Sequence, residues 1–296
     1  MEKVGGKRRI RVVGIVSNLY SGSTALSAVL GAHRDVFNMG EIASMWNETN
    51  PNRVKGRRCS ICRVVQRHCS VWDWLEPETI PVDRSTHSKL AKGLGANVVV
   101  DSSKNPVWFN RVDPRKGWLL LHLVKSPLEL AASYKLRRPA LRLQPAQAAY
   151  VWYKINSEAL KTLFMAKRRG ALTLTITYRD FAEKFEETVA MVMTTMGKTF
   201  EEGQKTYFEQ AQHFVGGNSW TMQDFMEGHK PTQDEPENKE RYQTKGRRRI
   251  YYDDKHLSVL SKKEARSVYS KSGVETLARH LGVNDRDDDK TRETLF

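Results

Sequence analysis

A strand, a tight turn and the start of a helix follow one another near the N-terminus, and this unit constrains the fold most. The apolar run IRVVGIV (10–16) is the strand candidate, and it continues into SNLYSGSTAL (17–26). Gly22 lets the backbone approach a ligand, while the hydroxyls of Ser21, Ser23 and Thr24 and the free N–H groups of the helix start can donate to an anion. We interpret the turn as an anion cradle; an N-capped helix after a buried strand is the plainer alternative.

The turn does not match the P-loop of nucleoside triphosphatases, G-x-x-x-x-G-K-[ST]. Gly14 lies eight residues before Gly22, and Ser23 rather than a lysine follows Gly22. Tyr20 stands where a cation would be expected. These departures disfavour an ordinary ATPase or GTPase and leave a P-loop-like small-molecule kinase as an alternative.

Strand-like and helix-like segments alternate along the chain. The strand candidates are rich in β-branched or apolar residues, and several are continuous rather than alternating, as expected for strands buried on both faces of a parallel sheet. They lie at 10–16, 97–101, 118–124 and 172–178, and helical patterns lie at 22–32, 105–112, 127–138, 144–169 and 180–196. The order predicts an α/β fold with a mostly parallel central sheet flanked by helices.

We expect one domain over residues 1–296, because the sequence has neither an internal repeat nor a second apolar core. Residues 47–75 form a cysteine-rich insertion in this interpretation, and the polar segment 226–248 is a mobile loop. A last amphipathic helix is expected at 261–281. The charged tail 284–296 is expected to be disordered.

The strong positive charge indicates an anionic partner. The net charge is +15 with an isoelectric point near 9.7, which suits nucleic acid, anionic lipid or a phosphorylated small ligand. No RNA- or DNA-binding motif is present, so we expect no nucleic-acid partner. No apolar run approaches the roughly 18 residues of a membrane span, and no signal peptide is apparent. We therefore expect a cytoplasmic protein without a membrane partner; the oligomeric state cannot be read.

The cysteines are Cys59, Cys62 and Cys69, all within eleven residues. The C-x-x-C spacing occurs in metal and redox sites, but a closed zinc site needs four ligands. The next candidate, His68, is adjacent to Cys69, and adjacent residues rarely both point at one metal. A local disulfide or buried thiols are therefore favoured over a metal.

A second anion-binding element is predicted in LVKSPLELAASYKLRR (123–138). Lys125 follows a buried strand, at the edge where open α/β sheets bind ligands. Ser133 lies eight residues later, about two helical turns into the next helix. A cation and a hydroxyl in this arrangement can converge on a phosphate.

Taken together, these segments resemble the sulfotransferases that use 3′-phosphoadenosine 5′-phosphosulfate (PAPS). Tyr20 to Leu26 is similar to their first motif, [RK]-S-G-[ST]-T-x-L, and Val124 to Pro127 with Ser133 to their V-R-D-P…S motif. Four further segments match in order: HRDVFNMGE (33–41), VVVDSSKNP (98–106), TYRDF (177–181) and GGN (216–218). The cysteine stretch resembles a bacterial-type subgroup, and the glutamate of the G-E element resembles a branch that includes the tyrosyl-protein sulfotransferases.

The resemblance implies a P-loop-like three-layer fold and a reaction that moves a sulfuryl group from PAPS to a hydroxyl or amine of a small molecule. It releases adenosine 3′,5′-bisphosphate and requires no metal. A basic rim favours a polar or anionic acceptor. The family includes Golgi enzymes, so a Golgi enzyme without its anchor is an alternative to a cytoplasmic one.

The resemblance also implies residue roles. Glu41 is the candidate base, with His33 and His122 as weaker candidates. Lys104 is the candidate cation at the sulfuryl group. The plainer alternative is that Asp101 to Ser103 cap a helix and that Lys104 is solvated.

The remaining roles concern the donor. Residues Tyr20 to Thr24 would hold its 5′ end, Lys125 and Ser133 its 3′-phosphate, and Lys245 and Arg247 would add a third contact. Tyr20 and Lys125 replace the family's basic residue and arginine, so a catalytically weakened nucleotide-binding relative is a further alternative.

Overall fold

A computed structural model describes residues 9–46, 59–64, 68–137, 143–217, 250, 252 and 254–296. The predicted loop 226–248, with Lys245 and Arg247, lies outside these residues. Residues 47–58 and 65–67 of the predicted insertion also lie outside them.

The centre of the molecule is a five-stranded sheet in which every neighbouring pair is parallel. Its order is β2-β3-β1-β4-β5. The strands are β1 (Val12–Ser17), β2 (Val36–Gly40), β3 (Val98–Lys104), β4 (Trp118–Val124) and β5 (Leu172–Thr177). The predicted α/β fold with a parallel sheet is confirmed. The strand β2 was not among the predicted strands, because VFNMG is short and contains Asn and Gly, which strands disfavour.

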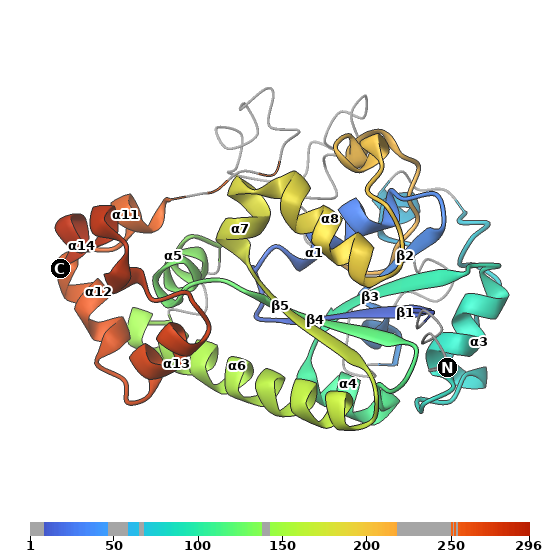
Figure 1. Ribbon diagram of the computed structural model, residues 1–296, viewed down its shortest axis with the longest axis horizontal. Helices are drawn as coiled ribbons and strands as arrows, with labels where there is room; N and C mark the ends of the chain where they lie inside the picture. The colour runs from blue at the N-terminus through green and yellow to red at the C-terminus, as the bar shows by residue number, and fades with distance from the viewer. Residues whose placement is uncertain are drawn as a thin grey trace, which may run out of the picture.

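Helices cover both faces of the sheet (Figure 1). In that view α1 (Ser23–Gly31), α7 (Tyr178–Glu183) and α8 (Phe185–Thr195) lie above the sheet, and α4 (Pro106–Val112) and α6 (Pro145–Arg168) lie below it. The strands β1, β3 and β4 are buried along their whole length, which explains their continuous apolar sequences. The predicted helix 180–196 is two helices, since the chain leaves helical geometry at Lys184.

The remaining helices lie around this three-layer centre. They are α2 (Ser60–Val64), α3 (Thr86–Gly93), α5 (Pro127–Arg137), α11 (His256–Val259), α12 (Lys262–Tyr269), α13 (Val274–His280) and α14 (Asp289–Leu295). Within the described parts of the chain, none of the helices is long and apolar enough to cross a membrane.

The strand register brings the predicted site residues to one edge of the sheet. Val16 of β1 pairs with Lys104 at the end of β3, and Gly40 at the end of β2 pairs with Asp101. On the other side of β1, Ser17 pairs with Leu123, just before Lys125. The carboxyl ends of these parallel strands therefore meet beside the Ser/Gly turn, where open α/β sheets bind ligands.

The C-terminal residues differ from the sequence-based expectation. The predicted helix 261–281 is interrupted at Gly273, whose φ of 82° is left-handed, and forms α12 and α13. The tail 284–296, expected to be disordered, contains α14, which ends in the buried Leu295. Leu295 packs in the same apolar cluster as α5, α6 and α12. The charged residues of α14 form the exposed face of an amphipathic helix, so the expectation of disorder was wrong.

Asp285 connects these C-terminal helices to the start of α5. Its carboxylate accepts hydrogen bonds from the backbone N–H of Leu128 at 3.0 Å and from the hydroxyl of Tyr269 at 2.8 Å. Burial and the neighbouring Glu129 raise the pKa of Asp285 to about 7. Between about pH 4 and pH 7, the carboxyl of Asp285 is therefore protonated in the folded protein but ionised in the unfolded chain.

We expect Asp285→Asn to make the protein progressively more stable than the wild type as the pH rises from about 4 to about 7. Because the folded pKa of about 7 lies above the ordinary value of 3.8, the wild type loses stability over this interval while asparagine does not titrate. The gain should reach roughly 2–4 kcal/mol above pH 7. Urea unfolding at several pH values measures it, with the exposed Asp287→Asn as the control. A pH-independent difference between Asp285→Asn and wild type would contradict the raised pKa.

Candidate active site

The Ser/Gly turn has the backbone geometry of an anion cradle. Gly22 caps α1 in the left-handed region, with φ of 89°. A Cβ on Gly22 would lie 2.6 Å from Cε2 of Tyr178, so a larger residue would displace this ring or the turn. Tyr20 also has a positive φ, 65°, and its ring meets that of Tyr134 edge-on at 5.5 Å. Tyr134 of α5 and Tyr178 at the start of α7 therefore pack against the turn.

Two hydroxyls of the turn are buried without a partner. Ser21 and Ser23 are each about 1% exposed, and among the described residues neither Oγ has a hydrogen-bond partner. Thr24, the next residue of α1, is also buried. Leaving a buried hydroxyl unpaired costs about 1–3 kcal/mol, and an anion at the helix N-terminus would satisfy both.

The structure brings Glu41 and Lys104 together beside this turn. Nζ of Lys104 donates to Oε1 of Glu41 in an ion pair. Lys104 ends β3 and is only 8% exposed, whereas a quarter of the Glu41 side chain is accessible. The two residues lie 63 positions apart in the chain and were predicted from separate motifs. Their contact places a carboxylate and an ammonium group at one point of the sheet edge.

A buried aspartate supports the strained backbone at Lys104, whose φ is 65°. Asp101 is fully buried and accepts from the backbone N–H of Ser103 at 2.8 Å. Its other oxygen lies 2.7 Å from both Nε2 of His87 and Nε1 of Trp108. Asp101 is therefore no helix cap. Strain of this kind is commonly retained at functional sites.

The cap of α4 is Asn105, whose side chain accepts from the N–H of Val107 at 2.9 Å. Together with the burial of Lys104, this contradicts the alternative of a helix cap with a solvated lysine. His87, which holds Asp101, carries no motif signal, so the sequence-based reasoning missed it.

Lys125 and Ser133 line one small cavity together with Glu129, Lys255 and His256. Nζ of Lys125 lies 4.5 Å from the centre of the Tyr178 ring, the ring that packs against Gly22. Ser133 donates to the carbonyl of Glu129 at 2.9 Å. Lys125 and Ser133 therefore line the same cavity, and Lys255 adds a cation that no motif indicated.

Gly216 and Gly217, which are distant in sequence from the other site residues, pack against Glu41 and Thr24. A Cβ on Gly216 would lie 2.8 Å from Cβ of Glu41, and one on Gly217 would lie 3.0 Å from Cγ2 of Thr24. The preceding residue, Val215, accepts from the N–H of Glu41 at 2.6 Å. The segment predicted from the GGN element thus contacts both the candidate base and the turn; Asn218 lies outside the described residues.

His122 and His33, the weaker candidates for the base, are buried and hydrogen-bonded within the fold. His122 is fully buried in β4, with Nε2 2.9 Å from Oδ1 of Asn156. Burial lowers the pKa of His122 to about 4. His33 is 4% exposed, and its Nδ1 accepts from the N–H of Asp35 at 3.0 Å. Glu41 is the better candidate because it is accessible and next to the turn.

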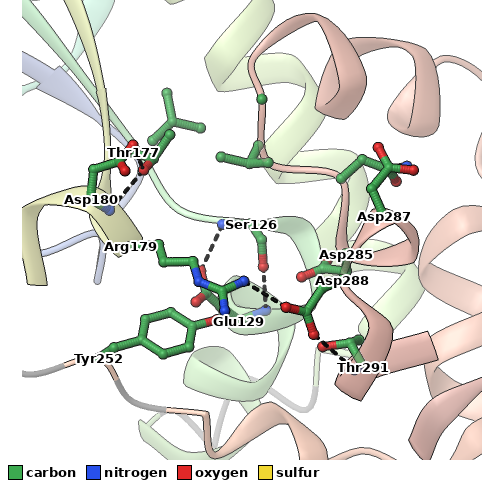
Figure 2. A pocket seen from close by; sticks show the side chains of 14 residues that line it. Ser126, Glu129, Thr177, Arg179, Asp180, Tyr252, Asp285, Asp287, Asp288 and Thr291 are labelled. Carbon is green, nitrogen blue, oxygen red and sulfur yellow. Dashed lines mark hydrogen bonds and ion pairs between the residues drawn. The ribbon is translucent and has the colours of Figure 1, made fainter. Parts of the chain in front are cut away.

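A larger cavity, of about 270 Å³, opens between β5, α5 and the C-terminal helices (Figure 2). Arg179 lies there beside Tyr252 and donates to Asp288 at 2.7 Å. Five carboxylate side chains line the cavity: Glu129, Asp180, Asp285, Asp287 and Asp288. This excess of negative charge disfavours a phosphorylated ligand in the larger cavity.

The cysteine stretch differs from the expectation in one respect. All three cysteines are free and buried, as one of the favoured alternatives had it, and no local disulfide forms. His68, the fourth ligand considered, is 98% exposed at its side chain and pairs with Asp73. The histidine beside the thiols is instead His213, 144 residues after Cys69. His213 is therefore a candidate fourth ligand beside the three cysteines, which the sequence did not predict.

No family model and no curated protein matches the chain. Among solved structures, it is similar to the sulfotransferase domain from the curacin biosynthetic pathway, with a TM-score of 0.51 and 19% identity over 71% of this chain and 81% of that domain. The fold is that of a sulfotransferase domain. The sulfotransferase domain from the Synechococcus PCC 7002 olefin synthase is less similar, with a TM-score of 0.43 and 16% identity over 70% of this chain and 80% of that domain. Mouse sulfotransferase SULT7A1 complexed with PAP has a TM-score of 0.46 and 11% identity over 96% of this chain and 88% of that chain.

Proposed function

We propose that this protein is a sulfotransferase that moves a sulfuryl group from PAPS to a hydroxyl or amine of a small-molecule acceptor. The observation that carries this proposal is the Glu41–Lys104 ion pair at the carboxyl edge of the sheet, beside a turn with two buried, unpaired hydroxyls. A base, a cation and an anion cradle are the groups that such a transfer needs. The sulfotransferase-domain fold supports the same proposal.

The residues present suit a donor with two separated phosphate groups. The hydroxyls of Ser21 and Ser23 and the N-terminus of α1 would hold the 5′ end. Lys125, Ser133 and Lys255, which share one cavity, would hold the 3′-phosphate. Lysine serves as a point charge here, without the two-pronged contact of an arginine. Lys245 and Arg247 remain proposed contacts from the loop that the structure does not describe.

The bound donor supplies the sulfuryl group, and the chain's own residues position it and manage the charge. Glu41 accepts the proton of the acceptor as the acceptor oxygen or nitrogen bonds to sulfur. Lys104 donates to the bridging oxygen, which keeps the electron pair of the breaking S–O bond and leaves with adenosine 3′,5′-bisphosphate. No metal ion takes part in this proposed scheme.

Lys104 would also supply the positive charge that Tyr20 lacks. The ring of Tyr20 packs on Tyr134, whereas Lys104 lies opposite the end of β1. It is therefore near the residues that would hold the leaving group. The acceptor is proposed to be polar or anionic because the protein carries a net charge of +15, and the cytoplasm is the proposed location.

We expect adenosine 3′,5′-bisphosphate to bind more tightly than ATP in isothermal titration. Lys125→Ala should weaken its binding about 10–100-fold, because a charge-assisted hydrogen bond to phosphate contributes about 1.5–3 kcal/mol. Lys116→Ala is the matched control: Lys116 is exposed and precedes β4, whereas Lys125 follows it. Tight binding of ATP alone would contradict the proposed donor. Incubation with PAPS and a metabolite extract, with mass spectrometry for added sulfo groups, then tests transfer and distinguishes an active enzyme from a relative that only binds.

A further inference from the structure

Three thiols and one imidazole lie close together in a part of the protein that the proposed function does not use. Cys59, Cys62 and Cys69 are buried, and their Sγ atoms and a ring nitrogen of His213 all lie within 4.8 Å of one another. The distances from Nδ1 of His213 to the three Sγ atoms are 3.8, 3.3 and 3.4 Å respectively. None of these four residues is among those proposed to hold the donor.

Hydrogen bonding alone does not explain this arrangement. An imidazole nitrogen carries either one proton or one lone pair, so Nδ1 of His213 can make one good hydrogen bond. Three sulfurs nevertheless surround it at similar distances. A zinc ion with Zn–S bonds of about 2.3 Å and a Zn–N bond of about 2.0–2.1 Å in tetrahedral geometry places sulfur and nitrogen about 3.5 Å apart. The three distances bracket that value.

We propose that Cys59, Cys62, Cys69 and His213 bind one Zn²⁺ ion in a closed, structural site. Four protein ligands complete the tetrahedral coordination of zinc and leave no open position for a substrate, as in structural zinc sites. Thiolate and imidazole ligands also favour zinc over the hard cations Mg²⁺ and Ca²⁺. On binding, the ion displaces the thiol protons to solvent, and no oxidant or reductant is needed.

The ion would join two segments that are distant in sequence. Around the cluster, the N–H of Ser60 donates to the carbonyl of Phe214 at 2.8 Å, and Nε1 of Trp72 donates to the carbonyl of His213 at 2.8 Å. Trp72 is fully buried. These contacts, together with the metal, would hold residues 213–215 against the cysteine segment.

The joined segment leads directly to the end of β2. Val215 donates to the carbonyl of Met39 at 3.0 Å and accepts from the N–H of Glu41 at 2.6 Å. The next residue, Gly216, packs against the Glu41 side chain. The zinc site would therefore fix the backbone on both sides of Glu41 without contacting the reacting groups, and its residues are positioning residues.

The test is the metal content of the full-length protein, purified without chelator or histidine tag. We expect about one zinc ion per chain by inductively coupled plasma mass spectrometry. His213→Ala should reduce the content to less than about one-tenth after dialysis against a weak chelator, because three remaining ligands bind zinc far less tightly. The matched control, His68→Ala, removes a histidine adjacent to Cys69 whose side chain is exposed, and should keep the full content.

Cobalt substitution of the wild type provides a second readout that needs no variant. Bound Co²⁺ should show the intense absorption of tetrahedral thiolate coordination, and this should be absent from Cys62→Ser if that variant folds. Removal of zinc should also lower the melting temperature, since a ligand that binds only the folded state stabilises it. The proposal would be overturned if the wild-type protein held no zinc after incubation with a zinc salt, or if it held iron instead of zinc. A full zinc content in His213→Ala would overturn it as well. None of these measurements depends on sulfuryl transfer.

Discussion

Glu41→Gln is expected to lower the turnover number for sulfuryl transfer about 10²–10⁴-fold, the usual contribution of a general base. Glutamine keeps the size of the side chain and can still contact Lys104, but it cannot accept the proton of the acceptor. Because Glu41 is not among the residues proposed to hold the phosphates, the dissociation constant for adenosine 3′,5′-bisphosphate should stay nearly unchanged. Initial rates with saturating PAPS, together with titration of the bisphosphate, measure both quantities.

A matched control for this variant is Glu187→Gln, an exposed glutamate in the first turn of α8. It should keep both the wild-type rate and the wild-type affinity. Retention of full turnover by Glu41→Gln would rule out Glu41 as the base. Equal losses in turnover and in bisphosphate affinity would instead indicate a structural role for the carboxylate.

Lys104→Met should lower the turnover number about 10²–10³-fold, the effect typical of removing one group that stabilises developing charge. Methionine approximates the length of the lysine stem and removes only the ammonium group. Because Lys104 is proposed to act on the bridging oxygen, the loss should appear in turnover more than in the affinity for adenosine 3′,5′-bisphosphate. Single-turnover measurement of product formation from bound PAPS tests this separately from release.

The exposed Lys92→Met in the last turn of α3 controls for the loss of a positive charge. If the ion pair works as a unit, Glu41→Gln combined with Lys104→Met should cost less than the product of the two separate losses. A Lys104→Met variant with the wild-type rate would refute its role, and Tyr20 or a residue outside the described chain would then have to stabilise the leaving group.

The sequence alone predicts the architecture and most of the candidate anion site. Continuous apolar runs identify β1, β3 and β4, because strands buried on both faces lack alternation. The partly buried edge strand β5 is identified by alternating Leu or Ile with Thr. The turn at Ser21 to Thr24 is a local feature, so its residues indicate its geometry before any tertiary contact is known. The placement of Lys125 and Ser133 at one cavity follows likewise from spacing within one segment. Local chemistry and local spacing are sufficient for these predictions.

The tertiary structure alone decides which distant side chains meet. Glu41 contacts Lys104 because β2 and β3 are neighbours in the sheet, and strand order is not encoded in any single segment. His213 joins the cysteines because Val215 lies beside the end of β2, a contact that no C-x-x-C spacing reveals. The charged tail folds because Leu295 finds an apolar surface on other helices. In each case the free energy comes from burial or pairing between segments far apart in the chain, so local composition could not predict it.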